Sequence, residues 1–137
     1  MEPKTYTIDA TGESVGRIAS KVATILMGKN TADFMNNKVA NHKVTIENAS
    51  KAKISQKKKK TTEYSQYSGY PGGLKFVTME RVIEKFGYGE VFKKAVYGML
   101  PKNKLGRQLF RNLYVYVGTE HPHEGQQPKE FNINSIK

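Results

Sequence analysis

A strand–turn–helix pattern near the start of the chain limits the folds that are open to it. Residues 6–10 alternate apolar and polar side chains as a β-strand does, and Thr11-Gly12 interrupts the alternation. Apolar residues then recur at helical spacing over residues 15–26, after Ser14 as a candidate N-cap and before Gly28, which favours a helix end. A strand and a helix that each bury one face predict a layered α/β domain.

Periodicity and the positions of Gly and Pro predict the remaining elements. We expect further extended segments at residues 44–47, 52–55 and 113–117, helices at 79–86, 90–99 and 104–112, and loops at 64–75 and 120–128. The adjacent lysines of Lys57–Lys60 repel one another, which favours an exposed loop or a strand end. No repeat or linker divides the chain, so we expect one domain over residues 1–137, with a mobile tail over 128–137.

Net charge limits the possible functions of the chain more than any single motif does. The chain carries 23 Lys and Arg against 12 Asp and Glu, a formal charge of +11. Such an excess repels itself in a compact state unless a polyanion neutralises it, and nucleic acid is the commonest polyanion. An anionic membrane is the other candidate, but no apolar run approaches the roughly 20 residues that span a bilayer. The chain has no cysteine, which excludes disulfides and thiolate chemistry, and no secretory pattern at its start, so we expect a cytoplasmic protein.

Two blocks concentrate this charge. Residues 51–60 contain six lysines and no acid, and residues 91–119 contain six basic residues and no acid. Such blocks are usually solvated faces, but in a chain of this net charge phosphate contact is the better interpretation, because each contact releases condensed counterions. Lysines outnumber arginines 19 to 4, which favours contact with phosphates over bidentate reading of base edges. We therefore expect recognition of RNA shape and backbone.

A tyrosine–glycine segment lies between the two blocks. Tyr64, Tyr67 and Tyr70 are interspersed with Ser, Gly and Pro over residues 64–75. Aromatic rings can stack on unpaired bases, and glycine allows a backbone to approach a ligand closely. The tyrosines can equally anchor the segment on the core, and the sequence leaves both interpretations open.

Two other motifs raise the question of an enzyme. The turn at Thr11–Arg17 could offer backbone N–H groups to an anion, but it lacks the spacing of a Walker or dinucleotide motif and favours a tight turn. Residues 120–124 hold two His and two Glu, but Pro122 keeps the segment extended, so we expect histidines near RNA phosphate and no metal. No catalytic set emerges. The rival functions are a phosphate-substrate enzyme using these motifs and a DNA-binding regulator using the helix at 104–112.

Four blocks of the chain then resemble one family. They are Asp9-Ala10 with Gly16–Ala19 and Gly28-Lys29, next Ser68–Lys75, next Ala95–Gln108, and finally Tyr116, Gly118, Glu120–His123 and Gln126–Pro128. Their order and spacing, from about Tyr6 to Pro128, resemble the bacterial large-subunit ribosomal protein L-thirteen family. Any one block is a weak match, but four in register are specific.

The resemblance implies a fold and a function. The fold would be a three-layer α/β domain, with a small, mostly parallel sheet flanked by helices and extended basic loops. The function would be binding of large-subunit ribosomal RNA early in assembly, in the cytoplasmic ribosome beside other subunit proteins, with no enzymatic activity, cofactor, metal or small-molecule substrate. The resemblance and the basic blocks together predict RNA contacts at Arg17, Lys57, Lys58, Lys59, Lys60, Tyr67, Ser68, Gly69, Tyr70, Pro71, Gly72, Gly73, Lys75, Lys102, Asn103, Lys104, Gly106, Arg107, Arg111, His121 and His123.

The middle of the chain departs from the family pattern. Residues 39–43 replace an acidic, glycine-containing stretch, Ser55-Gln56 replaces Thr-Gly, and Gln66-Tyr67 stands where an Arg-His pair is common. The loss of that arginine motivates the hypothesis that Lys57–Lys60 supplies phosphate contacts in its place.

Overall fold

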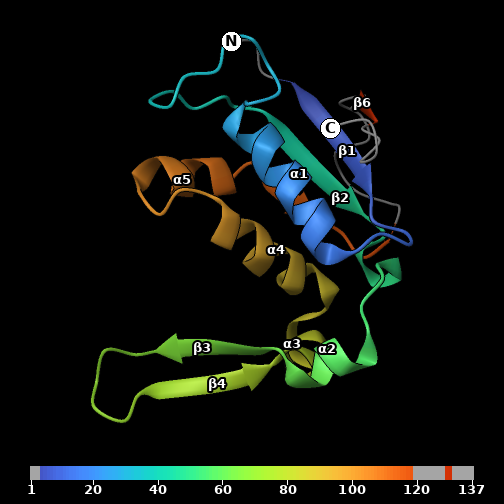
Figure 1. Cartoon of the computed structure of the whole chain (residues 1–137), viewed down its shortest axis with the longest axis vertical. Coiled ribbons are helices and arrows are strands. Elements are labelled where there is room, and N and C mark those ends of the chain that lie inside the picture. Colours follow the sequence, from blue (N-terminus) through green and yellow to red (C-terminus); the bar gives the residue numbers. More distant parts are fainter. Residues whose placement is uncertain (1–3, 119–128, 131–137) are drawn as a thin grey trace.

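The chain opens with a β–α–β unit, as its pattern predicts. The computed structural model describes residues 4–118 and 129–130 (Figure 1). Strand β1 (Thr5–Asp9) leads into helix α1 (Val15–Met27), which begins after Ser14 and ends before Gly28, and β2 (Lys43–Glu47) follows. The Ser14 side chain makes no capping hydrogen bond, so it is an N-cap by position alone. Seven apolar side chains of α1 are buried, which explains why its helical period was clear in the sequence.

The sheet is parallel throughout. Its order is β5-β2-β1-β6, where β5 is Leu113–Val115 and β6 is Lys129–Glu130. Parallel register places Ile8 opposite Ile46, and Ile46 opposite Val115, so apolar side chains line one face of the sheet. Crossover connections of this kind require helices packed against the sheet. The α/β class, the mostly parallel sheet and the flanking helices are therefore confirmed.

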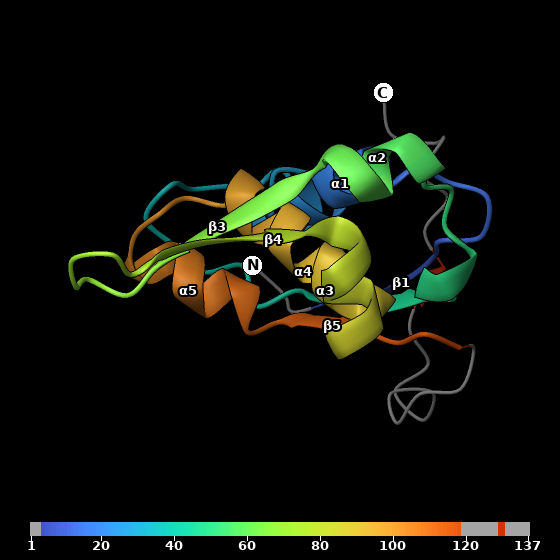
Figure 2. The same ribbon diagram turned by 90° about the horizontal axis from the view of Figure 1, so that it is seen from below.

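The long connection from β2 to β5 carries most of the remaining structure. In chain order its elements are η1 (Ala49–Lys51), α2 (Gln56–Thr61), β3 (Glu63–Tyr67), β4 (Leu74–Thr78), α3 (Met79–Phe86), α4 (Tyr88–Met99) and α5 (Lys104–Phe110). Figures 1 and 2 show the β3–β4 hairpin projecting from the end of the molecule that holds α2 and α3. Helix α4 returns toward the sheet and packs on α1 through its buried side chains Val91, Phe92 and Val96.

Three predicted elements differ from the structure. Residues 52–55 form no strand, only an isolated parallel bridge between Ser14 and Lys53. The lysines 57–60 lie in helix α2 and not in a loop or strand end, because Ser55 caps the helix by accepting a hydrogen bond from the N–H of Lys58 at 3.1 Å. The supposed loop at 64–75 is an antiparallel hairpin, since its Gly and Pro are confined to residues 69–73 and the flanking residues pair. The basic segments are thus less loop-like than expected.

The predicted helices at 79–86, 90–99 and 104–112 are confirmed, with shifted ends. The Thr78 hydroxyl caps α3 by accepting a hydrogen bond from the N–H of Arg81 at 3.4 Å. Gly87 separates α3 from α4, and α4 begins two residues earlier than predicted. Asn103 caps α5 by accepting a hydrogen bond from the N–H of Gly106 at 2.9 Å. The predicted mobile tail lies outside the described residues except for β6, which pairs with β1.

One ionisable side chain is buried beside the sheet. His42 is fully buried, and its Nδ1 accepts a hydrogen bond from the backbone N–H of Lys4 at 3.2 Å. Its ring meets Tyr6 edge to face at 5.8 Å, and its Nε2 has no hydrogen-bond partner among the described residues. Burial, and then the charge of Lys4, lower the pKa of His42 below its ordinary 6.5. The folded state therefore favours the neutral form of this imidazole.

This burial predicts a pH-dependent stability. Below pH 6.5 the unfolded chain binds a proton at His42 that the folded chain resists, so the free energy of unfolding should decrease as the pH falls from that value. His42→Gln keeps an acceptor for the N–H of Lys4 but has no proton to bind. Urea unfolding of both proteins across this pH range should show a weaker pH dependence in the variant. Parallel pH profiles would contradict the assignment.

Candidate nucleic-acid interface

Helix α5 separates its basic side chains from its apolar ones. Gly106 and Leu109 are buried, and Leu105 and Phe110 are half-buried against the core. Positions three and four residues apart share a helix face, and on the opposite face three cations recur at that spacing. All three are exposed, and they are Lys104, Arg107 and Arg111. A rigid helix therefore presents a row of cations to solvent.

Residues immediately before α5 extend this row. Lys102 and Asn103 are exposed in the turn after Pro101, and the Asn103 side chain is used as the helix cap. Gly106 is different, because a Cβ atom at this position would collide with the backbone carbonyl oxygen of Pro101. The predicted contact at Gly106 is thus placed in the interior, where glycine permits close packing of the turn on the helix.

The tip of the β3–β4 hairpin forms a second exposed region. Residues 68–73 connect the strands, with Gly69 and Gly72 in the left-handed conformation at φ of 91° and 76°, which glycine adopts without strain. The Tyr67 and Tyr70 side chains are 65% and 75% exposed. Lys75, on β4, is also exposed. Exposed rings beside a glycine-rich turn are an arrangement that suits stacking on unpaired bases.

Tyr64 packs on the core, which is one of the two roles that the sequence left open for the tyrosines of this segment. It is half-buried and packs on the core, and burial raises the pKa of its hydroxyl. The Lys94 ammonium lies 5.3 Å from the centre of its ring, a cation–π contact. Tyr64 therefore anchors the hairpin, whereas Tyr67 and Tyr70 remain available.

The lysines of α2 are not equivalent. Lys57, Lys58 and Lys60 are exposed, but Lys59 is half-buried. Its ammonium donates to the Tyr88 hydroxyl at 3.4 Å and lies 5.6 Å from the centre of the Tyr88 ring. Lys59 therefore joins α2 to α4, and three of the four lysines are free to meet phosphates.

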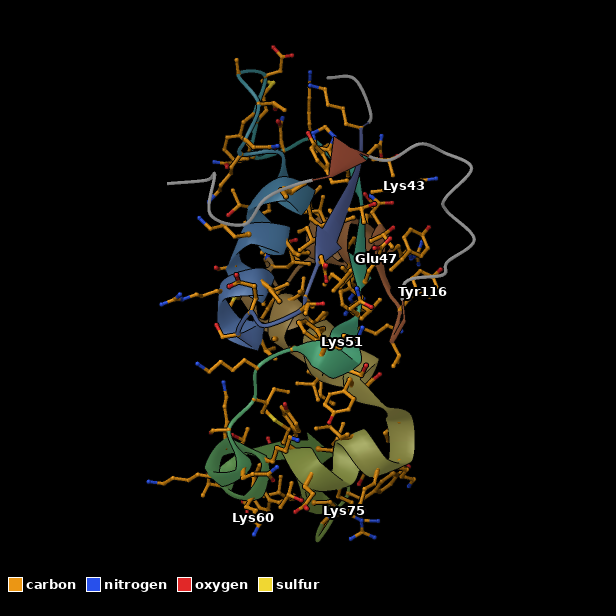
Figure 3. All side chains as sticks on the ribbon, turned by 90° about the vertical axis from the view of Figure 1, so that its right-hand side faces the viewer. Lys43, Glu47, Lys51, Lys60, Lys75 and Tyr116 are labelled. Atoms are coloured by element: carbon orange, nitrogen blue, oxygen red, sulfur yellow. The ribbon has the colours of Figure 1, made fainter. Side chains whose placement is uncertain are left out.

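The basic elements lie on the periphery of the fold. Figure 1 shows α5 and the hairpin extending on the same side of the molecule, with α4 between them. In Figure 3, Lys60 and Lys75 occupy one end of the molecule, and Lys43 lies toward the other end, beside the sheet. The exposed Lys93 and Lys94 of α4 add charge between the two regions. They belong to the acid-free block of residues 91–119, and helical spacing could have added them to the predicted contacts.

The strand-to-helix turn does not suit an anion. The N–H groups of Gly12 and Glu13 already donate to the carbonyls of Lys51 and Ala10, at 3.1 and 3.2 Å. The Asp9 carboxylate accepts from the Thr11 hydroxyl at 2.7 Å and from the Thr11 N–H at 2.9 Å, which lowers the pKa of Asp9. A carboxylate held ionised at the turn repels phosphate. Arg17 is exposed in the first turn of α1, two residues after the helix begins. The N-cap of this helix, Ser14, forms the isolated β-bridge with Lys53.

Some predictions concern parts of the chain that the structure leaves out. His121 and His123 lie outside the described residues. Within residues 4–118 and 129–130, no group of three or more His, Asp or Glu side chains could hold a metal ion. No helix in that same part of the chain is long and apolar enough to cross a membrane.

Fold and surface together define a small, basic α/β protein whose cations lie on peripheral elements around an apolar centre. The family model described as Ribosomal protein L13 matches residues 3–122. The protein "Large ribosomal subunit protein uL13" of Spiroplasma citri is 47% identical over 98% of this chain and 92% of its own length. The proteins of the same name from Thermus thermophilus and a Synechococcus species are 42% and 45% identical over 97% and 94% of this chain, and 94% and 85% of their own lengths.

The chain belongs to the ribosomal protein L13 family. The resemblance of the four sequence blocks is therefore confirmed over nearly the whole chain. Membership of a ribosomal protein family also agrees with the prediction that the chain is a structural protein and not an enzyme.

A pair of glycine variants tests the packing of the α5 turn. Gly106→Ala forces a methyl group against the Pro101 carbonyl, and we expect destabilisation by about 1–3 kcal/mol, as for other overpacked sites. The matched control is Gly98→Ala in α4, where a Cβ meets nothing within 4 Å. Better helix propensity should stabilise that variant by about 0.5–1 kcal/mol. Urea denaturation measures both, and equal stabilities of the two variants would contradict the close approach.

Proposed function

We propose that this chain is a structural constituent of the large ribosomal subunit in the cytoplasm, where it binds large-subunit ribosomal RNA and supports assembly of the subunit. The observation that carries the proposal is the exposed row of cations on α5, opposite a buried apolar face. The names of the family and of its relatives support the ribosomal setting.

The mode of binding follows from the types of side chain. Lysine is a point charge and arginine a planar fork, and both neutralise phosphates without needing a particular base. A helix that is packed on the core holds Lys104, Arg107 and Arg111 at fixed spacings, so it favours an RNA backbone of matching shape. The hairpin tip adds Tyr67 and Tyr70 as stacking surfaces. The protein would thus bring together RNA segments at α5 and at the hairpin.

Large-subunit proteins beside this chain are its other proposed partners. The apolar side chains Leu74 and Phe76 are 53% and 60% exposed on the hairpin, away from the sheet. Isolated exposed apolar residues are ordinary, but several on one projecting arm indicate a surface that is covered in an assembly.

The rival functions have less support. A phosphate-substrate enzyme would bind its substrate at the turn beside Asp9, whose lowered pKa favours a negative charge that repels phosphate. Membership of a ribosomal protein family also argues against an enzyme. A DNA-binding regulator would insert a recognition helix into a major groove. The seven residues of α5 bury one face and expose mainly cations, which suits phosphates better than base edges.

The α5 row can be tested by charge removal. We expect Lys104→Gln, Arg107→Gln and Arg111→Gln together to weaken binding to protein-free large-subunit ribosomal RNA. Loss of three phosphate contacts should reduce the slope of log affinity against log salt by roughly 2 to 3. The matched control removes the same charge from exposed lysines outside both basic blocks, with Lys4→Gln, Lys38→Gln and Lys43→Gln. Transfer RNA and duplex DNA serve as competitors.

The outcomes separate a specific role from a generic one. Equal losses in the two triple variants would mean that only net charge matters, and equal competition by all nucleic acids would contradict a ribosomal role.

The lysines of α2 are tested in the same assay. Lys57→Gln, Lys58→Gln and Lys60→Gln together should also lower the affinity and the salt slope, if these side chains replace a phosphate contact missing at Gln66. Lys59→Gln alone should leave the slope nearly unchanged and reduce thermal stability, because Lys59 contacts Tyr88. An unaltered slope in the triple variant would refute the compensation hypothesis.

A further inference from the structure

A groove lies where the hairpin meets helix α3. It has a volume of about 510 Å³, within the range of about 300–1,000 Å³ that is common for ligand sites. Strand β4 contributes Lys75 and Phe76, and α3 contributes Arg81, Lys85 and Phe86. Only Lys75 of these five residues was among the predicted contacts, so the groove is largely a product of the tertiary structure.

Charge on α3 is divided between its two flanks. At 100° per residue, Arg81 and Lys85 share one flank of the helix, and Glu80 and Glu84 share the other. Only the basic flank lines the groove, and Lys75 faces it from β4. Among the described residues, no carboxylate pairs with the Lys75 ammonium or the Arg81 guanidinium. The groove thus offers three cations and no lining acid, which complements an anion.

An exposed aromatic ring accompanies these cations. Phe86 is 65% exposed, although phenylalanine is usually buried in a protein core, whereas Phe76 lies on the opposite face of the hairpin from Lys75. The Lys85 ammonium lies 5.5 Å from the centre of the Phe86 ring, so a cation stands directly beside an aromatic ring. The Gln66 amide at the same groove can donate and accept hydrogen bonds. Cations next to exposed rings are the combination that holds single-stranded nucleic acid.

We infer that this groove binds an unpaired nucleotide of RNA. Its base stacks on Phe86, its phosphate is held by Arg81 with Lys75 and Lys85, and Gln66 contacts the base edge. The inference rests on the proposed function, because it names the part of the RNA that this end of the protein holds.

A neighbouring hollow indicates how the nucleotide is oriented in the groove. Phe86, Gln66 and Val77 line both hollows, and the second one also contains Glu90 and Lys94. Glu90 and Lys94 together give that hollow no net charge, whereas all charged residues of the groove are cations, so the phosphate of the nucleotide belongs beside Arg81. The base, which carries no charge, can occupy the side near Phe86.

Substitutions at Phe86 separate stacking from simple apolar contact. Phe86→Leu keeps an apolar side chain without a ring, and Phe86→Tyr keeps the ring. The probe is a short single-stranded RNA with a central 2-aminopurine, whose fluorescence is quenched when the base stacks. We expect Phe86→Leu to weaken binding about tenfold and to relieve the quenching, and Phe86→Tyr to behave like the unaltered chain. Because the ring is exposed, thermal unfolding of the variants should match.

Arg81 supplies an independent readout. Arg81→Gln should lower the salt slope of binding by roughly one, and Glu84→Gln on the other flank of α3 should not. A duplex RNA of the same length should be insensitive to Phe86→Leu, because its bases are not free to stack.

Binding to protein-free large-subunit ribosomal RNA distinguishes this inference from the proposed function. In one outcome the unaltered chain binds ribosomal RNA specifically, and the Phe86→Leu and Arg81→Gln variants bind ribosomal RNA and the single-stranded probe as tightly as the unaltered chain does. The groove inference is then overturned and the proposed function stands. If the unaltered chain shows no preference for ribosomal RNA, the proposed function fails. If Phe86→Leu leaves RNA binding unchanged and reduces only the incorporation of the chain into subunits that contain other proteins, the groove binds a protein and the nucleotide assignment is overturned.

Discussion

The contact between α1 and α4 is the constraint on which the rest of this structure depends. Phe92 and Val96 of α4 are fully buried, as are Ile18 and Val22 of α1, and each such side chain contributes about 1.5–3 kcal/mol by leaving water. Helix α4 also contacts α3, α5 and β5. It therefore connects the β–α–β unit to α5 directly, and to α2 and the hairpin through α3, on which α2 and β4 pack.

A chain with a net charge of +11 needs such a division between centre and periphery. The core, as far as the structure describes the chain, is apolar apart from a few buried polar residues, and one of these is His42, whose pKa is lowered by burial. The cations stand on the exposed face of α5, on α2 and beside the hairpin, where water screens their repulsion. Binding of RNA would relieve that repulsion, so the same arrangement that permits folding favours assembly with a polyanion.

Much of the fold was predictable because its signals are local. The period of α1, Gly28 after it, and the caps Thr78 and Asn103 depend only on neighbouring residues. The hairpin was missed because most residues of β3 and β4 are exposed, so strand pairing and not burial defines these strands. Helix α2 was missed because four like charges disfavour a helix, and Ser55 together with the Lys59–Tyr88 contact offsets that repulsion.

The sequence by itself determined the class of this protein: the parallel α/β frame, the family and the excess of basic charge all follow from residue order and type. Only the tertiary structure decided the role of individual residues. Tyr64 is an anchor while Tyr67 is exposed, Gly106 is buried below Pro101, and Lys59 pairs with Tyr88. The reason is physical: periodicity reports which face of an element is apolar, but the partner that a side chain meets is set by packing between elements distant in the chain.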